Sequence, residues 1–531
     1  MGKTLFSDGI FHSGKSEEDV FSFMAVEHGK IVGTYRNRPQ GEKFSKEISL
    51  GGQHVYPCLI DSHVHLMYTI ATAATGFPIC EITANGIQPN SLSGVEKKFR
   101  NYAKGKKKGE LIAASNYILS AMEERRLPTK EELDDWGGGR PVVIYNIDGH
   151  SSALSTEMLR KVGIDPDGHN GILSGEAHER IQGKLTDVIA ASITLPVLAK
   201  GITNFHNTCA QYGITMVGAL EGNGDSEQDT TTSLIVNLAR RFDLNIRFYF
   251  QYMDLKKAEK FAKYQKHLRI GGCGDWEMDG SVGSHSAAFR LPYADSGMTA
   301  PCYYSQEEVN RAVQKMDQAN YQIASHAIGD LAVERILEAL SHTTSNCLHR
   351  IEHCEYVTED ALKKLLAWDK EKLAVVMQPG YAWIDKHYLH TYEQFLPQEC
   401  IQEMYLRSFY DGGLCLCGSS DSPVQDMNPY VQMQGMVDFY RPEESLTAYE
   451  AFRAYTLHPA QAMLEDADYG TLEVDKRADF FTAEKDFFRL SAEQVGEFRP
   501  SQTYYGGNPY RHKKDSIGEL IKMMLKRPKK I

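Results

Sequence analysis

Two histidines, His63 and His65, stand one residue apart at the end of the apolar run 59–66. Side chains alternate along a β-strand, so residues i and i+2 point to the same face. If the run is a strand, both imidazoles converge at its end. Neutral imidazoles are good ligands for a borderline divalent metal such as zinc. The spacing by itself leaves a metal site and a chance pair of histidines equally open.

Other polar residues follow predicted strands in the same way. His326 ends the apolar run 321–326, His353 ends residues 350–353, and Asp421 follows the apolar strand 414–418. A lone histidine at a strand end is more often structural, whereas four histidines and one aspartate form a specific signal for a divalent metal. Such a site performs hydrolysis: the metal acidifies water, and a carboxylate moves the proton to a leaving amine. Asp421 is the predicted proton carrier, and the metal or a histidine, with His353 the candidate, polarises the substrate carbonyl.

These residues need a parallel sheet to bring them together. Across residues 57–465 apolar strands alternate with amphipathic helices, and a capping box at 305–308 opens one helix before the strand 321–326. Length and repetition favour a closed (β/α)₈ barrel of TIM type over an open doubly wound sheet, and no Gly-x-Gly-x-x-Gly fingerprint opens a βα unit. In such a barrel the active site lies at the carboxyl ends of the strands.

The two ends of the chain differ from this pattern. Residues 1–56 read as short strands joined by turns, and residues 466–510 contain strand-like runs that could complete the same β module. The tail 511–531 is basic, and five of its apolar residues fall on one helix face. We expect this helix to pack on the body of the protein or on a partner subunit rather than on a membrane surface. The five residues are Ile517, Leu520, Ile521, Met524 and Leu525.

Composition excludes several classes of function. The net charge of −12 over 531 residues argues against a nucleic-acid-binding protein, which usually shows a basic footprint. The ten cysteines are scattered without a Cys-x-x-Cys pair, and no signal peptide is recognisable, so reduced thiols in a cytoplasmic protein are expected. No run of 18 apolar residues predicts a transmembrane helix. A small-molecule substrate and, by default for such enzymes, a homodimer are the expected partners.

Motifs along nearly the whole chain resemble the amidohydrolase superfamily, in the branch of N-substituted formamide deformylases and YtcJ-like proteins. The motifs lie at 51–65, 148–150, 279–284, 326–330, 350–353, 378–379, 418–423 and 455–460. The resemblance implies a (β/α)₈ barrel with a small β-sandwich built from both chain ends. It also implies substrate contacts at Asp148, at His150 and in the loop after Asp279. The metal ligands that it implies are His63, His65, His326, His353 and Asp421, with Asp421 as proton shuttle.

The sequence departs from this family where a second metal would be held. Many relatives carry a lysine four residues before the aspartate of Asp-Gly-Ser, and a carboxylated lysine bridges two metals in binuclear members. This chain has Asp275 at that position, and Asp275, Glu277 and Asp279 share one strand face by their spacing. Either Asp275 or Glu277 could replace the bridge, the site could hold one metal, or these acids could form only a hydrogen bond or salt bridge.

A second departure concerns the substrate. Relatives often place an arginine after the serine of the Asp-Gly-Ser loop, where this chain has Ser284-His285-Ser286, so a contact to a substrate anion is in doubt. Several aromatic residues could line the pocket or belong to the core, and Trp276 is the candidate for substrate contact. The others are Tyr68, Phe77, Tyr381 and Trp383.

The sequence therefore predicts a hydrolase of a non-peptide carbon–nitrogen bond in an amide, formamide or cyclic amide. Its cofactor would be a divalent metal, zinc by preference, with one or two ions per chain. A deaminase is disfavoured because His326 is followed by Ala-Ile-Gly-Asp and not by a proton-donating glutamate. A catalytically inactive barrel that serves as a binding subunit is opposed by the retention of all five core ligands.

Overall fold

A parallel eight-stranded sheet forms the centre of the molecule, in a computed structural model that describes residues 2–83, 86–222 and 229–531. Its strands are buried along nearly their whole length, as both faces of a parallel sheet are covered. In the order in which they pair they are β6 (Leu59–Val64), β13 (Ile214–Glu221), β14 (Asn245–Phe250), β15 (Arg269–Glu277), β16 (Gln322–Ala327), β17 (His349–His353), β18 (Leu373–Met377) and β19 (Cys415–Gly418).

The sheet closes on itself between its first strand and the segment after its last. Val64 and Ser422 form a parallel bridge. The amide of Asp421 donates to the carbonyl of His63, and the amide of His65 donates to the carbonyl of Ser422, each over 2.9 Å. The predicted TIM-type barrel is thereby confirmed, and closure places His63, His65 and Asp421 side by side.

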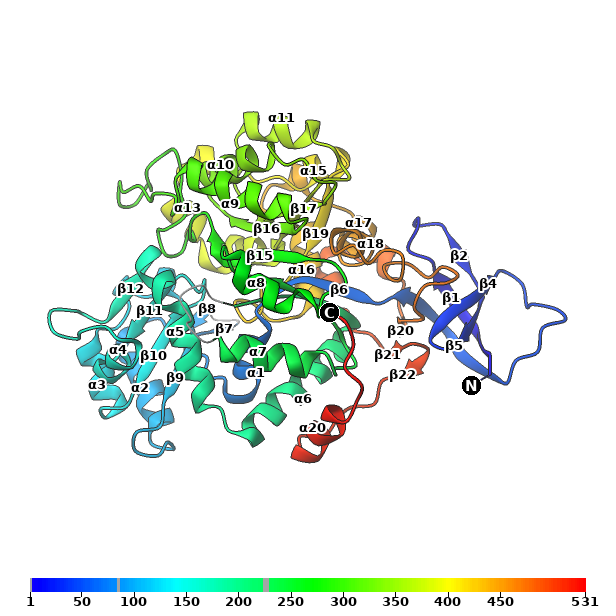
Figure 1. Cartoon of the computed structure of the whole chain (residues 1–531), viewed down its shortest axis with the longest axis horizontal. Coiled ribbons are helices and arrows are strands. Elements are labelled where there is room, and N and C mark those ends of the chain that lie inside the picture. The colour runs from blue at the N-terminus through cyan, green and yellow to red at the C-terminus, as the bar shows by residue number, and fades with distance from the viewer. Residues whose placement is uncertain (1, 84–85, 223–228) are drawn as a thin grey trace.

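Helices follow the strands and cover the outside of the barrel (Figure 1). The capping box predicted at 305–308 is present, with the Ser305 hydroxyl accepting from the Glu308 amide at the start of α9. The covering helices are α1 (Leu66–Thr75), α6 (Leu195–Tyr212), α7 (Thr230–Ala239), α8 (Leu255–Ala262), α9 (Gln306–Gln318), α10 (Asp330–Leu340), α11 (Glu359–Ala367), α12 (Pro379–Ile384), α13 (Thr391–Phe395), α14 (Gln398–Ile401), α15 (Arg407–Asp411), α16 (Pro429–Val437), α17 (Ala448–Arg453), α18 (Leu457–Ala462) and α19 (Ala492–Glu497).

Strands from both chain ends share a second sheet, at the right of Figure 1. The C-terminal strand β20 pairs antiparallel with β5, so the predicted cooperation of the two ends holds. The pairing defines one sheet, and the two-layered sandwich stays a prediction, as do the domain boundaries. The strands are β1 (Thr4–His12), β2 (Val20–Phe21), β3 (Phe23–Glu27), β4 (Lys30–Tyr35), β5 (Lys46–Pro57), β20 (Phe480–Ala483), β21 (Gln502–Tyr505) and β22 (Asn508–Pro509).

A third unit, absent from the sequence prediction, is inserted between α1 and α6. It is a four-stranded sheet with its own hydrophobic core, and it forms the cyan lobe of Figure 1. An Asp148-Gly149 turn joins β10 to β11 as a hairpin, with Gly149 at a φ of +77°. Its elements are β9 (Ile112–Tyr117), β10 (Val142–Asn146), β11 (Ser151–Leu154), β12 (Ile172–Ser174), α2 (Leu92–Ala103), α3 (Lys130–Gly137), α4 (Thr156–Val162) and α5 (Glu176–Ser192). A separate short hairpin, β7 (Glu81–Thr83) with β8 (Gly86–Gln88), precedes it.

The basic tail docks on the body of the protein. Helix α20 (Ile517–Met524) buries Leu520 and Met523, and the Ile531 amide donates to the carbonyl of Tyr264. The predicted apolar face is only partly used: of its five residues Leu520 is buried, whereas Ile517, Ile521, Met524 and Leu525 stay exposed. Among the described residues no single helix is long and apolar enough to span a membrane, and α5 with α6 would qualify only as a pair bent by 109°.

Candidate functional site

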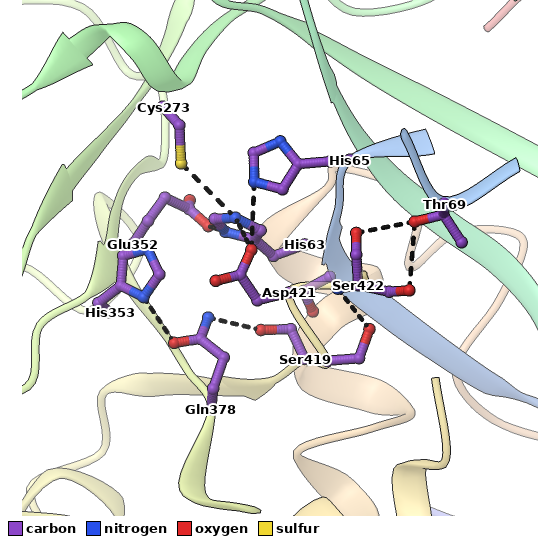
Figure 2. Close-up of polar contacts among 12 residues, drawn as sticks. His63, His65, Thr69, Cys273, Glu352, His353, Gln378, Ser419, Asp421 and Ser422 are labelled. Carbon is purple, nitrogen blue, oxygen red and sulfur yellow. Dashed lines mark hydrogen bonds and ion pairs between the residues drawn. The ribbon is translucent and has the colours of Figure 1, made fainter. Parts of the chain in front are cut away.

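Three predicted metal ligands meet where the barrel closes (Figure 2). Nε2 of His63 lies 3.1 Å from Oδ1 of Asp421, and Nε2 of His65 lies 3.2 Å from the same oxygen. His63 is fully buried at the end of β6, whereas His65 precedes α1 and its side chain is 26% exposed. Burial acts to raise the pKa of Asp421, but the charges and hydrogen bonds of His63 and His65 outweigh it and hold that pKa well below its usual range.

The ring of His63 is oriented by a buried ion pair. Its Nδ1 lies 2.8 Å from Oε2 of Glu352, and Arg350 binds both oxygens of that carboxylate over 2.8 Å. All three side chains are fully buried. A carboxylate on Nδ1 fixes the imidazole and leaves Nε2 for the site, as partners of metal-ligating histidines commonly do.

His326 of β16 and His353 at the end of β17 complete a cluster of four imidazoles. Their ring centroids are 4.5 Å apart, and His353 lies 5.2 Å from His63 by the same measure. Nδ1 of His353 lies 2.7 Å from Oε1 of Gln378, which fixes the ring as Glu352 fixes His63. Nε2 of His353 and Nδ1 of His326 are buried and have no hydrogen-bond partner among the described residues.

Strand β15 departs from regular pairing beside these histidines. Gly272 pairs with Ser325, yet the next pair is Glu277 with His326, so four residues bulge out of the ladder. Gly271 and Gly272 hold φ values of +98° and +105°, which side chains rarely adopt, and a Cβ on Gly271 would lie 1.9 Å from the carbonyl oxygen of Ala324. The bulge brings Cys273 and Glu277 to the histidines.

Cys273 lies close to three of the four clustered histidines, His63, His326 and His353. Its Sγ lies 3.7 Å from Nε2 of His63 (Figure 2). Its sulfur lies within 4.8 Å of ligand atoms of His63 and His353, and in a second group within 4.8 Å of Glu277 and His326. Burial raises the pKa of the Cys273 thiol, a shift that the neighbouring His63 opposes.

Two other acids of this segment are engaged by backbone amides. Oδ2 of Asp275 accepts a hydrogen bond from the amide of Met253 over 3.0 Å. Asp279 is fully buried and accepts from the amides of Ala288, Ile328 and Gly329, so it holds the loop after β15 in place. Its Oδ1 is 3.5 Å from Nε2 of His326. The bulge breaks the period-two spacing, and the common face expected for these acids is lost.

The indole of Trp276 does not reach the substrate side. It is fully buried in the main hydrophobic core, and its Nε1 donates to the carbonyl of Tyr252 over 3.1 Å. Phe77 is likewise a core residue, stacked on Tyr102, and the Trp383 indole donates to Asp438. The structure thus places Trp276 in the core because the bulge turns it away from the barrel mouth.

Asp148 and His150 reach the site from the inserted sheet. Oδ2 of Asp148 accepts from the hydroxyls of Ser281 and Ser284 over 2.8 and 2.7 Å, which ties the insert to the loop after β15. Nδ1 of His150 lies 2.8 Å from Oε1 of Glu179, and its ring centroid lies 5.1 Å from that of His326. Burial lowers the pKa of His150, but Glu179 outweighs it and raises the pKa to about 10.

Two connected lobes of empty space flank Asp421 and His353. One, with an empty volume of about 730 Å³, is lined by Met377, Tyr381, Tyr392, Met404, Phe439 and Glu355 among others, and we call it the aromatic lobe. The other, of about 1000 Å³, lies over Cys273, Glu277, Glu221 and Tyr68, and we call it the acidic lobe. Asp148, His150, His353 and Asp421 border both lobes, so a bound substrate would have its reactive bond at the histidines and a substituent in each lobe.

Residue types and unpaired atoms fit a divalent metal. The donors are imidazoles, a carboxylate and a thiol, a set suited to zinc and related ions. Buried nitrogens without a partner are costly, and the unpaired nitrogens of His326 and His353 lie among those donors.

Sequence reasoning assigned no role to Cys273, Glu352, Gln378 or Glu179. Arg350 and Glu352 share a strand face by their i, i+2 spacing, which is a signal for a paired role. The glycines around Cys273 signal a bulge. Nothing in the local sequence points to Glu179, which lies on α5 of the inserted unit that the sequence did not predict.

The chain was compared with known proteins. The sequence family described as Amidohydrolase family matches residues 46–510. YtcJ of Bacillus subtilis (strain 168), whose name assigns it only provisionally to the amidohydrolases, is 23% identical over 95% of this chain and 98% of its own. An N-substituted formamide deformylase of Arthrobacter pascens is 23% identical over 90% of this chain and 92% of its own.

A solved structure supports the fold. A metal-dependent hydrolase of Pyrococcus furiosus, described as uncharacterized, superposes with a TM-score of 0.69 at 22% identity, covering 92% of this chain and 100% of its own. The family match spans most of the sequence and contains every strand of the barrel. The chain therefore belongs to the amidohydrolase family and is a hydrolase of carbon–nitrogen bonds other than peptide bonds.

Proposed function

We propose that this protein hydrolyses the amide or formamide bond of a small molecule. A divalent metal would be held by the four clustered histidines, and Asp421 would carry the proton. The observation that carries the proposal is the convergence of His63 and His65 on one oxygen of Asp421, at 3.1 and 3.2 Å. Ligand residues placed this way leave the barrel mouth open to substrate.

Residues of this chain would hold the metal in two neighbouring groups. His63, His65 and Asp421 form one, and His326 with His353 forms the other. Cys273 and Glu277 lie between them and favour two ions over one, with zinc the ion that thiol and imidazole donors suit best. Such an ion supplies Lewis acidity, which makes water a usable nucleophile at neutral pH.

The proton balance of the reaction runs through Asp421. As a water oxygen attacks the amide carbon, the Asp421 carboxylate accepts one proton from it. When the carbon–nitrogen bond breaks, the same carboxyl group gives that proton to the departing nitrogen, so an amine and a carboxylic acid result. Asp421 lies on the border of both lobes, within reach of a bond placed between them.

Surrounding residues fix the orientation of the reactive groups. Glu352 and Gln378 fix the rings of His63 and His353 by contacts of 2.8 and 2.7 Å. His150 lies beside His326, where it can donate to the substrate carbonyl oxygen, and Asp148 holds the loop that closes the aromatic lobe. These residues act by holding groups in place through hydrogen bonds that exist before the substrate binds.

The deaminase and binding-subunit alternatives find less support. In the described residues after His326 the helix α10 begins, and its first residue Asp330 is engaged by Arg290 rather than facing the lobes. An inactive barrel would not need to keep unpaired buried nitrogens on two histidines. We also propose a reducing, cytoplasmic location, since the ten cysteines are free, and a homodimer as the default assembly.

Purified protein loaded with zinc and offered N-benzylformamide tests the proposal directly. We expect release of formate and benzylamine, loss of that activity on dialysis against a chelator, and recovery when zinc is returned. Formate is measured by an enzyme-coupled assay and metal by elemental analysis. Activity that survives complete metal removal would overturn the metal-dependent mechanism. Failure on a panel of simple formamides, acyl amides and cyclic amides with metal present would overturn the substrate class.

A further inference from the structure

The aromatic lobe is lined by three carboxylates and, among the described residues, by no lysine or arginine. Its charged lining residues are Asp148, Glu355 and Asp421, together with the histidines of the site, and no lysine or arginine among the described residues lines this lobe or the acidic lobe. The remaining lining is largely methionine and aromatic side chains. His150 also lines the lobe, but it is already paired with Glu179, so a substrate carboxylate or phosphate would find no unpaired lysine or arginine among the described lining residues.

Glu355 lines this lobe together with the catalytic carboxylate Asp421. Strand β17 ends at His353, and two successive left-handed residues, His353 at a φ of +67° and Cys354 at +48°, turn the chain before Glu355. The hydroxyl of Tyr392 donates to Oε1 of Glu355. Oε2 has no hydrogen-bond partner among the described residues, and the side chain lines the lobe.

The surroundings of Glu355 offer no counterion. The charged groups that act on it are Asp385 and Asp279, and both are acids. A carboxylate taken out of water without a cation is costly. The missing cation can come from a ligand that enters the lobe.

Aromatic faces next to Glu355 suit a cationic or strongly donating group. Tyr392 packs against Tyr381 with ring centroids 6.2 Å apart and against Tyr356 at 5.8 Å. Tyr381, Tyr392 and Phe439 line the lobe. Ring faces attract ammonium and guanidinium-like groups, and a charge-assisted hydrogen bond to a carboxylate is stronger than a neutral one.

We propose that Glu355 is a specificity-determining residue that selects substrates whose apolar substituent ends in an ammonium or amidinium group. The inference rests on the proposed function, because it takes the reactive bond to lie at Asp421. The substituent then extends through the aromatic lobe, with its ring against the tyrosines and its cationic end on Oε2 of Glu355. Substrates with an anionic substituent are rejected by the same charge.

Binding of unreactive probes tests the inference without any need for turnover. Zinc-loaded full-length protein is titrated by calorimetry with benzamidine, with its neutral isostere benzamide and with benzenesulfonate, at about pH 8, well above the ordinary pKa of a glutamate. We expect benzamidine to bind at least about tenfold more tightly than benzamide, and benzenesulfonate more weakly than either. In the Glu355→Gln variant the benzamidine preference should fall to about twofold or less.

Two further variants separate specificity from stability. Glu359→Gln removes an equal charge at an exposed site in the first turn of α11 and should leave the benzamidine preference unchanged. Tyr392→Phe keeps the carboxylate and should keep the preference, which tests the assignment even if Glu355→Gln folds poorly. Equal binding of benzamidine and benzamide by the wild-type protein overturns the inference, and so does a preference that survives in folded Glu355→Gln.

The outcomes also separate this inference from the proposed function. If no formamide or amide is hydrolysed while Glu355 still selects benzamidine, the proposed reaction fails and the binding site stands. If N-benzylformamide is hydrolysed but its 4-aminomethyl derivative shows no gain in kcat/KM that depends on Glu355, the reaction stands and the specificity assignment fails.

Discussion

At the scale of single residues, Asp421 combines two properties that a proton carrier needs. Its carboxylate is fixed by two imidazoles, and the left-handed φ of +56° at Asp421 turns the side chain toward them as the chain leaves β19. The buried carboxylate of Asp61 accepts from the amides of His63 and Ser420, so it joins the two segments that carry these groups. Asp421 is therefore held at the mouth of the barrel, next to the space where the substrate binds.

Replacing this carboxylate by an amide should separate catalysis from folding. We expect Asp421→Asn to keep the fold and much of the metal but to lose about 10²–10⁴-fold in kcat, since an amide cannot accept and return a proton. The matched control is Asp426→Asn, an exposed aspartate five positions along, which should retain full activity. Steady-state kinetics with elemental analysis measure both effects. Full turnover in metal-loaded Asp421→Asn would rule out the proton-carrier role.

At the scale of elements, strand β15 supplies the donors on which the proposed second ion depends. Its glycine bulge brings Cys273 within 3.7 Å of Nε2 of His63 and places Glu277 with His326, while Asp275 binds the amide of Met253. The backbone thus presents a thiol and one carboxylate where the sequence argument considered two carboxylates. Either donor can lie between two ions.

Metal content in three variants resolves these donors. We expect about two ions per chain in the wild-type protein, with fewer in Cys273→Ser and in Glu277→Gln. Asp275→Ala is the matched control on the same strand and should keep the wild-type content, because its carboxylate is engaged by Met253. Elemental analysis gives moles of metal per chain, and circular dichroism checks the fold. A loss of metal in Asp275→Ala alone would instead favour the bridging role first considered for Asp275.

The same strand shows where sequence patterns stop being informative. The alternation of strands and helices predicted the barrel, and strand-end positions pointed to His63, His65, His326, His353 and Asp421, because both follow from local periodicity. The position of Cys273 depends on a bulge that breaks this periodicity. The glycines of that bulge pack closely against Ala324 and Leu220 on neighbouring strands. Glu179 and His150 meet through an inserted sheet, and tertiary contacts of this kind leave no spacing to read.

At the scale of the whole molecule, the end of the barrel opposite the site is tied together by Glu465. Its side chain is 1% exposed, and it pairs with Arg247 of β14 over 2.6 Å and with Arg269 at the start of β15 over 3.2 Å. Lys266 adds a third cation at 3.2 Å. Glu465 follows α18, so this cluster links two barrel strands to the segment that leads into the terminal sheet. Residues at this end of such a barrel serve stability rather than catalysis.

Removing the charge of Glu465 should therefore weaken folding and leave the reaction intact. We expect Glu465→Gln to lower the free energy of unfolding by about 3–5 kcal/mol near neutral pH, because two buried arginines lose their partner. Glu497→Gln, at an exposed glutamate of α19, is the control and should change it by less than about 0.5 kcal/mol. Urea unfolding measures the stability, and the metal content of the folded variant should match that of the wild-type protein.

Acid should erase this difference between Glu465→Gln and the wild-type protein. Burial acts to raise the pKa of Glu465, but Arg247 and Arg269 outweigh it and lower the pKa from 4.5 to about 2. A carboxyl group whose pKa is depressed by folding contributes its full stability above the unfolded value and loses it as the pH falls toward the folded value. The gap in unfolding free energy should stay constant above about pH 5 and shrink steadily between about pH 4.5 and 2. A gap that persists undiminished at the acid end of this window would show that the two proteins differ in packing and not in the charge of Glu465.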